Sequence, residues 1–322
     1  MGLAPAPSSF VDPVTGAPAF GAYEGPMPAV RWPSLGFGAR TLRRKKWVWA
    51  GIATEEIWIG LAVVRTGYAA TAFAYAYDLA ERRMLADETR IAPALASHVG
   101  DDPHARGALA TFGRRVAIER THEGFAIRAK LGKLAIDATL ADGRAPTALS
   151  AIAPLGSRLA NATEKRALLA VRGRARAGDR DISLDGALGG YDYTNGLMPR
   201  HTRWRWAFAL GRDDAGAPIA FNFVSGFVGE AECAAFVDGR AHAMPEPRFS
   251  FDAPTSPWRL EADGIDLVFE PGAMHAQYTN LGLVRSKFIQ PAGTFSGTLR
   301  VSGRDRRVER VAGVVEDQDV LW

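Results

Sequence analysis

Tyr191–Phe208 reads YDYTNGLMPRHTRWRWAF, and no other segment of the 322 residues alternates ionisable and aromatic side chains so densely. On a β-strand, successive side chains point to opposite faces. The Asn-Gly pair and the proline within 195–199 favour a turn, so we expect a loop carrying Asp192 and then a strand carrying His201. That strand separates two sets of side chains: His201, Arg203 and Arg205 on one face, and Thr202, Trp204, Trp206 and Phe208 on the other.

Short alternating segments recur on both sides of this stretch at roughly ten-residue intervals, with Gly or Asp-Gly turns between them. Residues 69–79, AATAFAYAYDL, place large side chains on one face and alanines on the other. This division is typical of a sheet whose small face is approached closely by another layer. The pattern predicts an all-β protein with room for two antiparallel β-barrels or sandwiches in one chain.

The chain is expected to divide into three parts. Residues 1–35 are rich in Pro and Gly and should be extended. Residues 36–180 would form the N-terminal barrel half and residues 181–322 the C-terminal half. Two regions lack a clear strand pattern: we expect a short helix near 79–86 and a polar loop over 141–165.

Composition and charge exclude several classes of protein. The net charge is only +4 and the basic residues are dispersed, apart from Arg43–Lys46, so we expect no nucleic-acid partner. Cys233 is the single cysteine, which excludes an internal disulfide. No segment approaches the ~20 apolar residues of a membrane helix, the start lacks a signal-peptide pattern, and we expect a cytoplasmic protein. The histidines lack metal-ligand spacing, so neither a metal nor another cofactor is expected.

His201 is the first candidate for proton transfer, because imidazole titrates near neutral pH. Arg203 and Arg205 on the same face would disfavour its charged form and keep it a base. Asp192 would orient the imidazole or act as an acid itself. The alternative is structural, with the two arginines paired to acids such as Asp192 inside a barrel.

Glu230 and Glu232 lie two positions apart on an expected strand and hence on one face. In a dry site their repulsion would make one of them, Glu232, a general acid, whereas on a wet face they would be solvated. Asn222 lies between two phenylalanines, so it either ties strands together or points into a pocket. The candidate substrate-binding residues are the aromatic and polar groups of this region: Tyr191, Tyr193, Arg203, Trp204, Arg205, Trp206 and Asn222.

Four segments carry a resemblance to a known family: KKWVWAGI, GYDYTNGLMPRHTRWRWAFA, FNFVSGF followed by a Glu and FVDG, and the terminal GVVEDQDVLW. From about Trp32 to the C-terminus the chain resembles the bacterial family labelled domain of unknown function 2804 (DUF2804). It is also distantly similar to lipocalin-like two-barrel proteins such as carotenoid hydratases of the hydroxyneurosporene synthase type and tocopherol cyclase. One departure is Gln318, where a histidine would be expected near the terminal V-E-D motif.

The resemblance implies two lipocalin-like barrels and acid–base chemistry on an isoprenoid-like, apolar substrate without a cofactor. The first hypothesis is therefore a hydratase or lyase, isomerase or cyclase, in which Asp192 or Glu232 protonates the substrate and His201 accepts a proton. The second is a non-catalytic carrier of a lipid or isoprenoid, and the third is a structural protein with filled barrels. The enzyme hypothesis requires His201 and Asp192 to meet in one apolar cavity.

Overall fold

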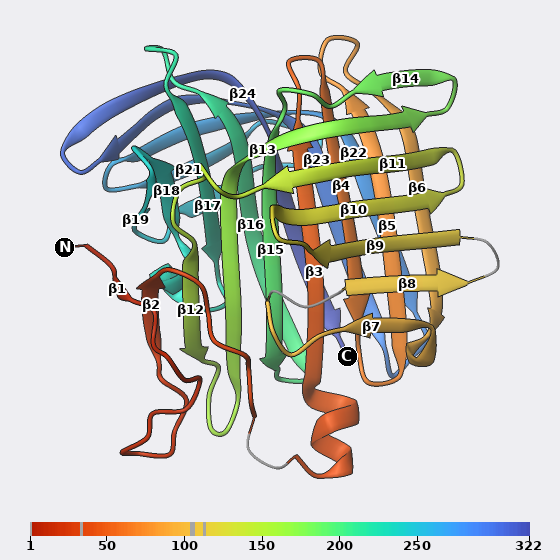
Figure 1. Cartoon of the computed structure of the whole chain (residues 1–322), viewed down its shortest axis with the longest axis vertical. Coiled ribbons are helices and arrows are strands. Elements are labelled where there is room, and N and C mark those ends of the chain that lie inside the picture. Colours follow the sequence, from red (N-terminus) through yellow and green to blue (C-terminus); the bar gives the residue numbers. More distant parts are fainter. Residues whose placement is uncertain (1, 33–34, 104–106, 112–113) are drawn as a thin grey trace.

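The computed structural model describes residues 2–32, 35–103, 107–111 and 114–322. Two curled and almost wholly antiparallel sheets make up the chain, one closing to a near-barrel and the other to a half-barrel (Figure 1). The all-β, two-barrel prediction is confirmed. Among the described residues, no helix has the length and apolar character needed to cross a bilayer.

The near-barrel sheet holds fifteen strands. In chain order they are β1 (Ala4–Pro5), β2 (Gly21–Glu24), β3 (Arg44–Ala53), β4 (Ile57–Arg65), β5 (Ala69–Asp78), β6 (Arg83–Pro93), β7 (Ser97–Val99), β8 (Gly107–Thr111), β9 (Arg114–Arg120), β10 (Gly124–Leu131), β11 (Leu134–Ala141), β12 (Leu149–Pro154), β13 (Ala160–Ala177), β14 (Arg180–Ser183) and β15 (Leu188–Leu197). The main path runs β6-β5-β4-β3-β15-β13-β11-β10-β9-β8-β7. It curls because β7 at its end returns to contact β4.

The half-barrel sheet holds nine strands in the order β19-β18-β17-β16-β24-β23-β22-β21-β20. These are β16 (His201–Arg212), β17 (Pro218–Ser225), β18 (Ala234–Val237), β19 (Arg240–Ala243), β20 (Arg248–Ser250), β21 (Trp258–Ala262), β22 (Ile265–Asn280), β23 (Arg285–Val301) and β24 (Arg304–Leu321). Three short helical turns complete the chain: η1 (Ala39–Arg43), η2 (Ala94–Ala96) and η3 (Gly229–Glu232). The sheet changes between β15 and β16, whereas the expected domain boundary at 180/181 stays a prediction.

Three apolar layers hold the sheets together. The first fills the near-barrel, the second lies between the near-barrel and the half-barrel, and the third fills the half-barrel. The alternation predicted for β5 is confirmed, since its alanines belong to the first layer while Phe73, Tyr75 and Tyr77 belong to the second. The large face of β5 is therefore the one that meets the other sheet.

Several local predictions were wrong. Asp192 lies on β15, which pairs with β3 on one side and β13 on the other, so the Asn-Gly pair is in a strand rather than a turn. The helix expected near 79–86 is replaced by a turn and β6, because pairing with β5 outweighs local propensity. The region 141–165 contains β12 and the start of β13. Its many polar residues favoured a loop in the sequence. In the structure several of these side chains are buried and hydrogen-bonded within the sheet.

Candidate functional site

A cavity of about 410 Å³ lies between the two sheets. Its walls are mainly aromatic. Trp47 stacks on Trp204 with ring centroids 5.8 Å apart, and Trp49 meets Trp206 edge-on at 4.9 Å. Each pair joins one ring from the near-barrel to one from the half-barrel, so the cavity exists only when both sheets are in place. A concave, mainly apolar site of this size is typical of a small-molecule pocket.

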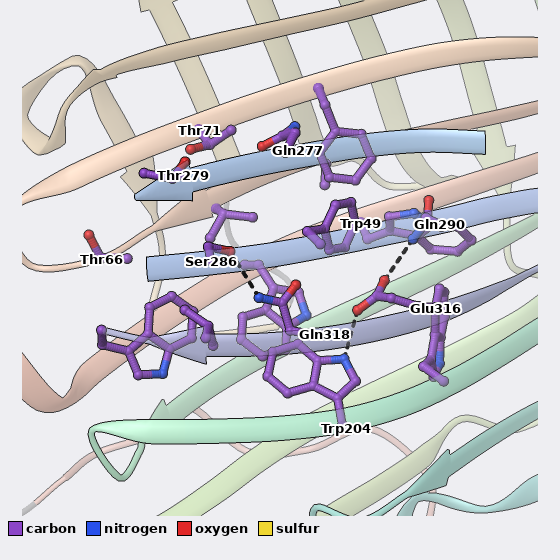
Figure 2. A pocket seen from close by; sticks show the side chains of 18 of the residues that line it. Trp49, Thr66, Thr71, Trp204, Gln277, Thr279, Ser286, Gln290, Glu316 and Gln318 are labelled. Atoms are coloured by element: carbon purple, nitrogen blue, oxygen red, sulfur yellow. Dashed lines mark hydrogen bonds between the residues drawn. The ribbon is translucent and has the colours of Figure 1, made fainter. Parts of the chain in front are cut away.

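Glu316 on β24 is a carboxyl buried in the wall of this cavity (Figure 2). Trp204 Nε1 donates to its Oε1 at 2.7 Å, and Gln290 Nε2 donates to its Oε2 at 2.8 Å. Burial raises the pKa of Glu316 to about 7, although the two hydrogen bonds pull it down. Near neutral pH the group is thus present in both protonation states, as a general acid or base requires.

A chain of hydrogen bonds supports Glu316 from behind. Tyr75 Oη donates to Gln290 Oε1 at 2.6 Å, and Trp58 Nε1 donates to Tyr75 Oη at 3.4 Å. Burial raises the pKa of Tyr75, so its hydroxyl stays a donor at physiological pH. Because the amide oxygen of Gln290 is occupied, its nitrogen is directed at Glu316. The carboxyl is therefore held in one orientation toward the cavity.

A buried ion-pair cluster also reaches the cavity wall. Lys165 Nζ on β13 lies 2.6 Å from Asp192 Oδ1 and 3.4 Å from Glu232 Oε2. The three side chains are 3%, 8% and 4% exposed, so the pairs are poorly screened by water. Trp47 Nε1 donates to Asp192 Oδ2 at 3.3 Å. The structure thus brings Asp192 and Glu232 to one ammonium group.

Burial and charge act against each other in this cluster. Burial alone would lower the pKa of Lys165, but the carboxylates of Asp192 and Glu232 outweigh it and the pKa is raised. Burial raises the pKa of Glu232 in spite of the nearby ammonium. Burial and the negative charge of Asp192 therefore favour the neutral form of Glu232, and the ammonium of Lys165 opposes them.

Asn222 is fully buried and has two partners. Its Oδ1 accepts from Trp206 Nε1 at 2.8 Å, and its Nδ2 donates to the backbone oxygen of Glu232 at 2.5 Å. Of the two alternatives for this residue, the structure supports the one in which it ties strands together. Asn222 orients Trp206 and Glu232 rather than lining the cavity itself.

Uncharged polar side chains form the other part of the lining. Figure 2 shows Thr66, Thr71, Gln277, Thr279, Ser286 and Gln318 along it. Gln318 Nε2 donates to Ser286 Oγ at 3.2 Å, while no hydrogen bond among the described residues uses the hydroxyls of Thr71 or Thr279. Gln318, which stands where the resemblance would place a histidine, thus contributes an uncharged amide to the cavity. Free hydroxyls here can bind oxygen atoms of a ligand.

The expected meeting of His201 and Asp192 does not occur. His201 is 51% exposed, and its Nε2 lies 2.8 Å from Asp319 Oδ1. Arg203 also pairs with Asp319 at 2.6 Å. Arg205 donates to the backbone oxygen of Phe249 at 2.9 Å. The predicted division of faces on β16 is right, but the cavity lies on the aromatic face, so Trp204 and Trp206 line it and the three basic residues do not.

Tyr191 and Tyr193 are also outside the cavity. Both belong to the apolar layer inside the near-barrel, where their hydroxyls donate to the backbone oxygens of Pro103 at 2.6 Å and Gly100 at 3.0 Å. Alternation along β15 explains this placement, because odd positions turn into the barrel while Asp192 turns out toward the half-barrel. The tyrosines hold the near-barrel closed rather than contact a ligand.

The two glutamates at 230 and 232 differ in environment. They lie on η3 rather than on a strand, so they do not share a face. Glu230 is exposed and Glu232 is buried, in agreement with the expectation that at least one of them is solvated. A catalytic role for Glu232 or Asp192 stays a prediction.

Sequence reasoning missed three of the main residues. Lys165 fell in a segment interpreted as a loop. Gln290 is an uncharged residue of a strand that was not considered for the site, and Glu316 belongs to the terminal V-E-D motif, whose role was left open. For Glu316 a signal was present, because alternation on that strand places it and Gln318 on one face between valines. Lys165 and Gln290 gave no local signal, since only pairing between distant strands brings them to Asp192 and Glu316.

The fold defines a lipocalin-like protein with two barrels. Kievitone hydratase from Nectria haematococca aligns with 94% of this chain and 98% of its own, at a TM-score of 0.53 and 11% identity. CghA, solved with Sch210972, aligns with 98% of this chain and 97% of its own, at a TM-score of 0.53 and 12% identity. The structure of a Nitrosomonas europaea protein assigned as an AttH aligns with 90% of this chain and 98% of its own, at a TM-score of 0.51 and 14% identity. These likenesses concern the fold.

The particular family follows from the sequence. A family model described as Domain of unknown function (DUF2804) matches residues 10–322, and the chain belongs to that family. The resemblance noted from the four sequence segments is confirmed. A comparison with curated protein sequences found no match.

Proposed function

We propose that the protein is a cofactor-independent acid–base enzyme of the hydratase or lyase, isomerase or cyclase type, acting on a hydrophobic, isoprenoid-like small molecule. The observation that carries this proposal is Glu316, a carboxyl with a pKa of about 7 in the wall of an aromatic cavity. A carboxyl poised near neutrality, in contact with a ligand-sized apolar space, is what general acid catalysis needs.

In the dehydration direction, protonated Glu316 gives its proton to a hydroxyl oxygen of the substrate. The C–O bond breaks with its electron pair on oxygen, and water leaves. The carboxylate of Asp192 takes a proton from the neighbouring carbon, and that C–H electron pair forms the new C=C bond. Proton exchange with water then returns Glu316 to the acid and Asp192 to the base. Hydration is the same sequence in reverse.

Lys165 has two roles in this proposal. Its ammonium holds Asp192 at 2.6 Å, and its charge favours the negative charge that gathers on the substrate oxygen as the C–O bond breaks. Burial raises the pKa of Glu232, which also lies beside Lys165 and serves as a proton reserve. His201 has no part, because it is exposed on the face of β16 that does not line the cavity.

The ligand is accommodated by the arrangement of the lining. The indole rings of Trp47, Trp49, Trp204 and Trp206 suit a flat or unsaturated carbon skeleton. The unpaired hydroxyls of the lining suit a small number of oxygen substituents. A hydratase is among the proteins that share the fold, which is an analogy at the level of fold.

The second candidate function is a carrier of the same class of ligand. The predominance of aromatic rings in the lining favours it, since tight binding of an apolar molecule needs no titrating group. A carrier would bind its ligand and release it chemically unchanged.

Proton exchange distinguishes the two functions before the reaction is known. The purified protein is incubated in D2O with its co-purified ligand or with an apolar extract of its host, and C–H deuteration is followed by mass spectrometry. An enzyme deuterates one compound catalytically, and Glu316→Gln lowers this rate by at least about 100-fold. Arg176→Gln, on an exposed ion pair, is the matched control. Equal deuteration by wild type and Glu316→Gln would sink the enzyme proposal.

A further inference from the structure

The mouth of the cavity is formed by segments that lie together at one end of the molecule (Figure 1). They are the β4–β5 turn, the β22–β23 tip (residues 281–284) and Trp322, and η1 packs beside the β4–β5 turn. A Cβ at Gly67 would lie 2.1 Å from the backbone oxygen of Thr41, so the β4–β5 turn packs directly on η1. Arg200 donates to the backbone oxygens of Leu283 at 2.7 Å and Trp322 at 2.8 Å, which joins the tip to the C-terminus. We call these joined segments the mouth face.

Exposed apolar side chains are concentrated on the mouth face. Ten large apolar residues are exposed in the described part of the chain, and eight of them lie on or beside these segments. Leu281 and Leu283 are 76% and 77% exposed at the β22–β23 tip, and Leu95 is 96% exposed next to the β4–β5 turn. Leu42 is exposed on η1, and Phe37 is exposed just before it in the chain. Single exposed apolar residues need no explanation, but a gathering of this kind marks an interaction surface.

Positive charge surrounds the same surface. Arg40, Arg200 and Arg285 are exposed and form no ion pair with any carboxylate in the described part of the chain. The nearby acids are already engaged, Asp319 with Arg203 at 2.6 Å. The mouth face therefore combines protruding apolar groups with unpaired arginines.

We propose that the mouth face docks on an anionic lipid bilayer, so that an apolar ligand passes between the membrane and the cavity without crossing water. Leucine and phenylalanine tips suit shallow insertion among lipid chains, while the arginines suit the phosphates above them. Tyr68 and Trp322 line the mouth, and aromatic residues with a polar edge favour the headgroup level. The inference rests on the cavity and its mouth and does not depend on the chemistry of Glu316.

Vesicle flotation tests the proposal with the full chain. Vesicles of phosphatidylcholine alone are compared with vesicles containing phosphatidylglycerol as about a third of the lipid, at low and high salt. The wild type is expected to float with the anionic vesicles at low salt, less at high salt, and little with the neutral ones. Arg40→Gln with Arg285→Gln should weaken binding by about 5-fold for each arginine. Leu281→Asp with Leu283→Asp should weaken it at least about 10-fold.

The controls keep the test decisive. Ala215→Asp adds one charge at the β16–β17 turn, at the opposite end of β16 from the mouth face, and should bind like wild type. Circular dichroism and thermal unfolding show whether each variant is folded. The proposal is overturned if folded wild type does not bind anionic vesicles, or if the leucine variant binds as well as wild type. It is also overturned if sedimentation shows a wild-type dimer that the leucine variant abolishes, since a second copy would then cover this face.

Discussion

Trp204 links the aromatic wall of the cavity to the acid at its edge. Its Nε1 donates to Glu316 Oε1 at 2.7 Å while its ring stacks on Trp47 at 5.8 Å. One side chain thus binds the ligand region and tunes the carboxyl, and substitutions can separate these two effects.

Trp204→Phe should raise the pKa of Glu316 above about 7, because a donor that stabilises the carboxylate is removed. A reaction that needs the protonated acid should then retain its rate to higher pH, with the alkaline limb shifted by about one unit. The pH dependence of the deuteration rate measures this shift. Trp47→Phe changes the stacked partner without touching that hydrogen bond, and an equal shift in this variant would contradict the assignment.

Glu316→Gln should change how stability depends on pH. A folded pKa of about 7 lies above the ordinary glutamate value of 4.5, so this group contributes stability below pH 4.5 that is lost as pH rises through 7. The free energy of unfolding of Glu316→Gln relative to wild type should therefore increase by ~3 kcal/mol between pH 4 and pH 8. Urea unfolding at several pH values measures it, and a difference independent of pH would refute the raised pKa.

Lys165→Met should destabilise the protein by about 3–5 kcal/mol, because Asp192 and Glu232 lose their buried counter-charge. Adding Asp192→Asn to Lys165→Met should restore part of the loss, since the uncompensated carboxylate is removed. Chemical denaturation of the single and double variants measures both effects. The exposed pair of Arg176 and Asp181 offers the control, where Arg176→Met should cost less than about 1 kcal/mol.

His201→Ala should leave catalysis within about 2-fold of wild type and stability within about 1 kcal/mol, because the imidazole pairs with Asp319 on an exposed face. The deuteration assay and thermal unfolding measure the two quantities. A loss of activity of 10-fold or more would show that the site extends to the face of β16 that points away from the cavity.

The fold class could be predicted because strand alternation is local. The separation of Phe73, Tyr75 and Tyr77 from the alanines of β5, and of Trp204 and Trp206 from the basic residues of β16, is visible in consecutive residues. Both divisions are present in the structure. Local propensity was misleading where pairing on both sides of a strand decided the outcome, as for Asp192 on β15.

The candidate site was predictable only in part. Asp192 was chosen as an ionisable group in the aromatic-rich stretch and Glu232 as one of two neighbouring carboxylates, and the structure brings both of them to Lys165. His201 was chosen because imidazole titrates near neutral pH, but the residues of its own strand could not say which of the two strand faces meets the near-barrel. A shift of one residue in register exchanges the faces of a strand, and only contact with another sheet selects between them.

The amino-acid sequence alone therefore established that this is an antiparallel β protein. It also established which residues share each face of a strand and which side chains can titrate. Those properties follow from the two-residue period of the extended backbone, which acts over neighbouring positions. The packing of the half-barrel on the near-barrel decided the rest. It buried Glu316 and Lys165 between the sheets and left His201 exposed, because burial and charge pairing depend on residues that are distant in the chain and adjacent only in the folded molecule.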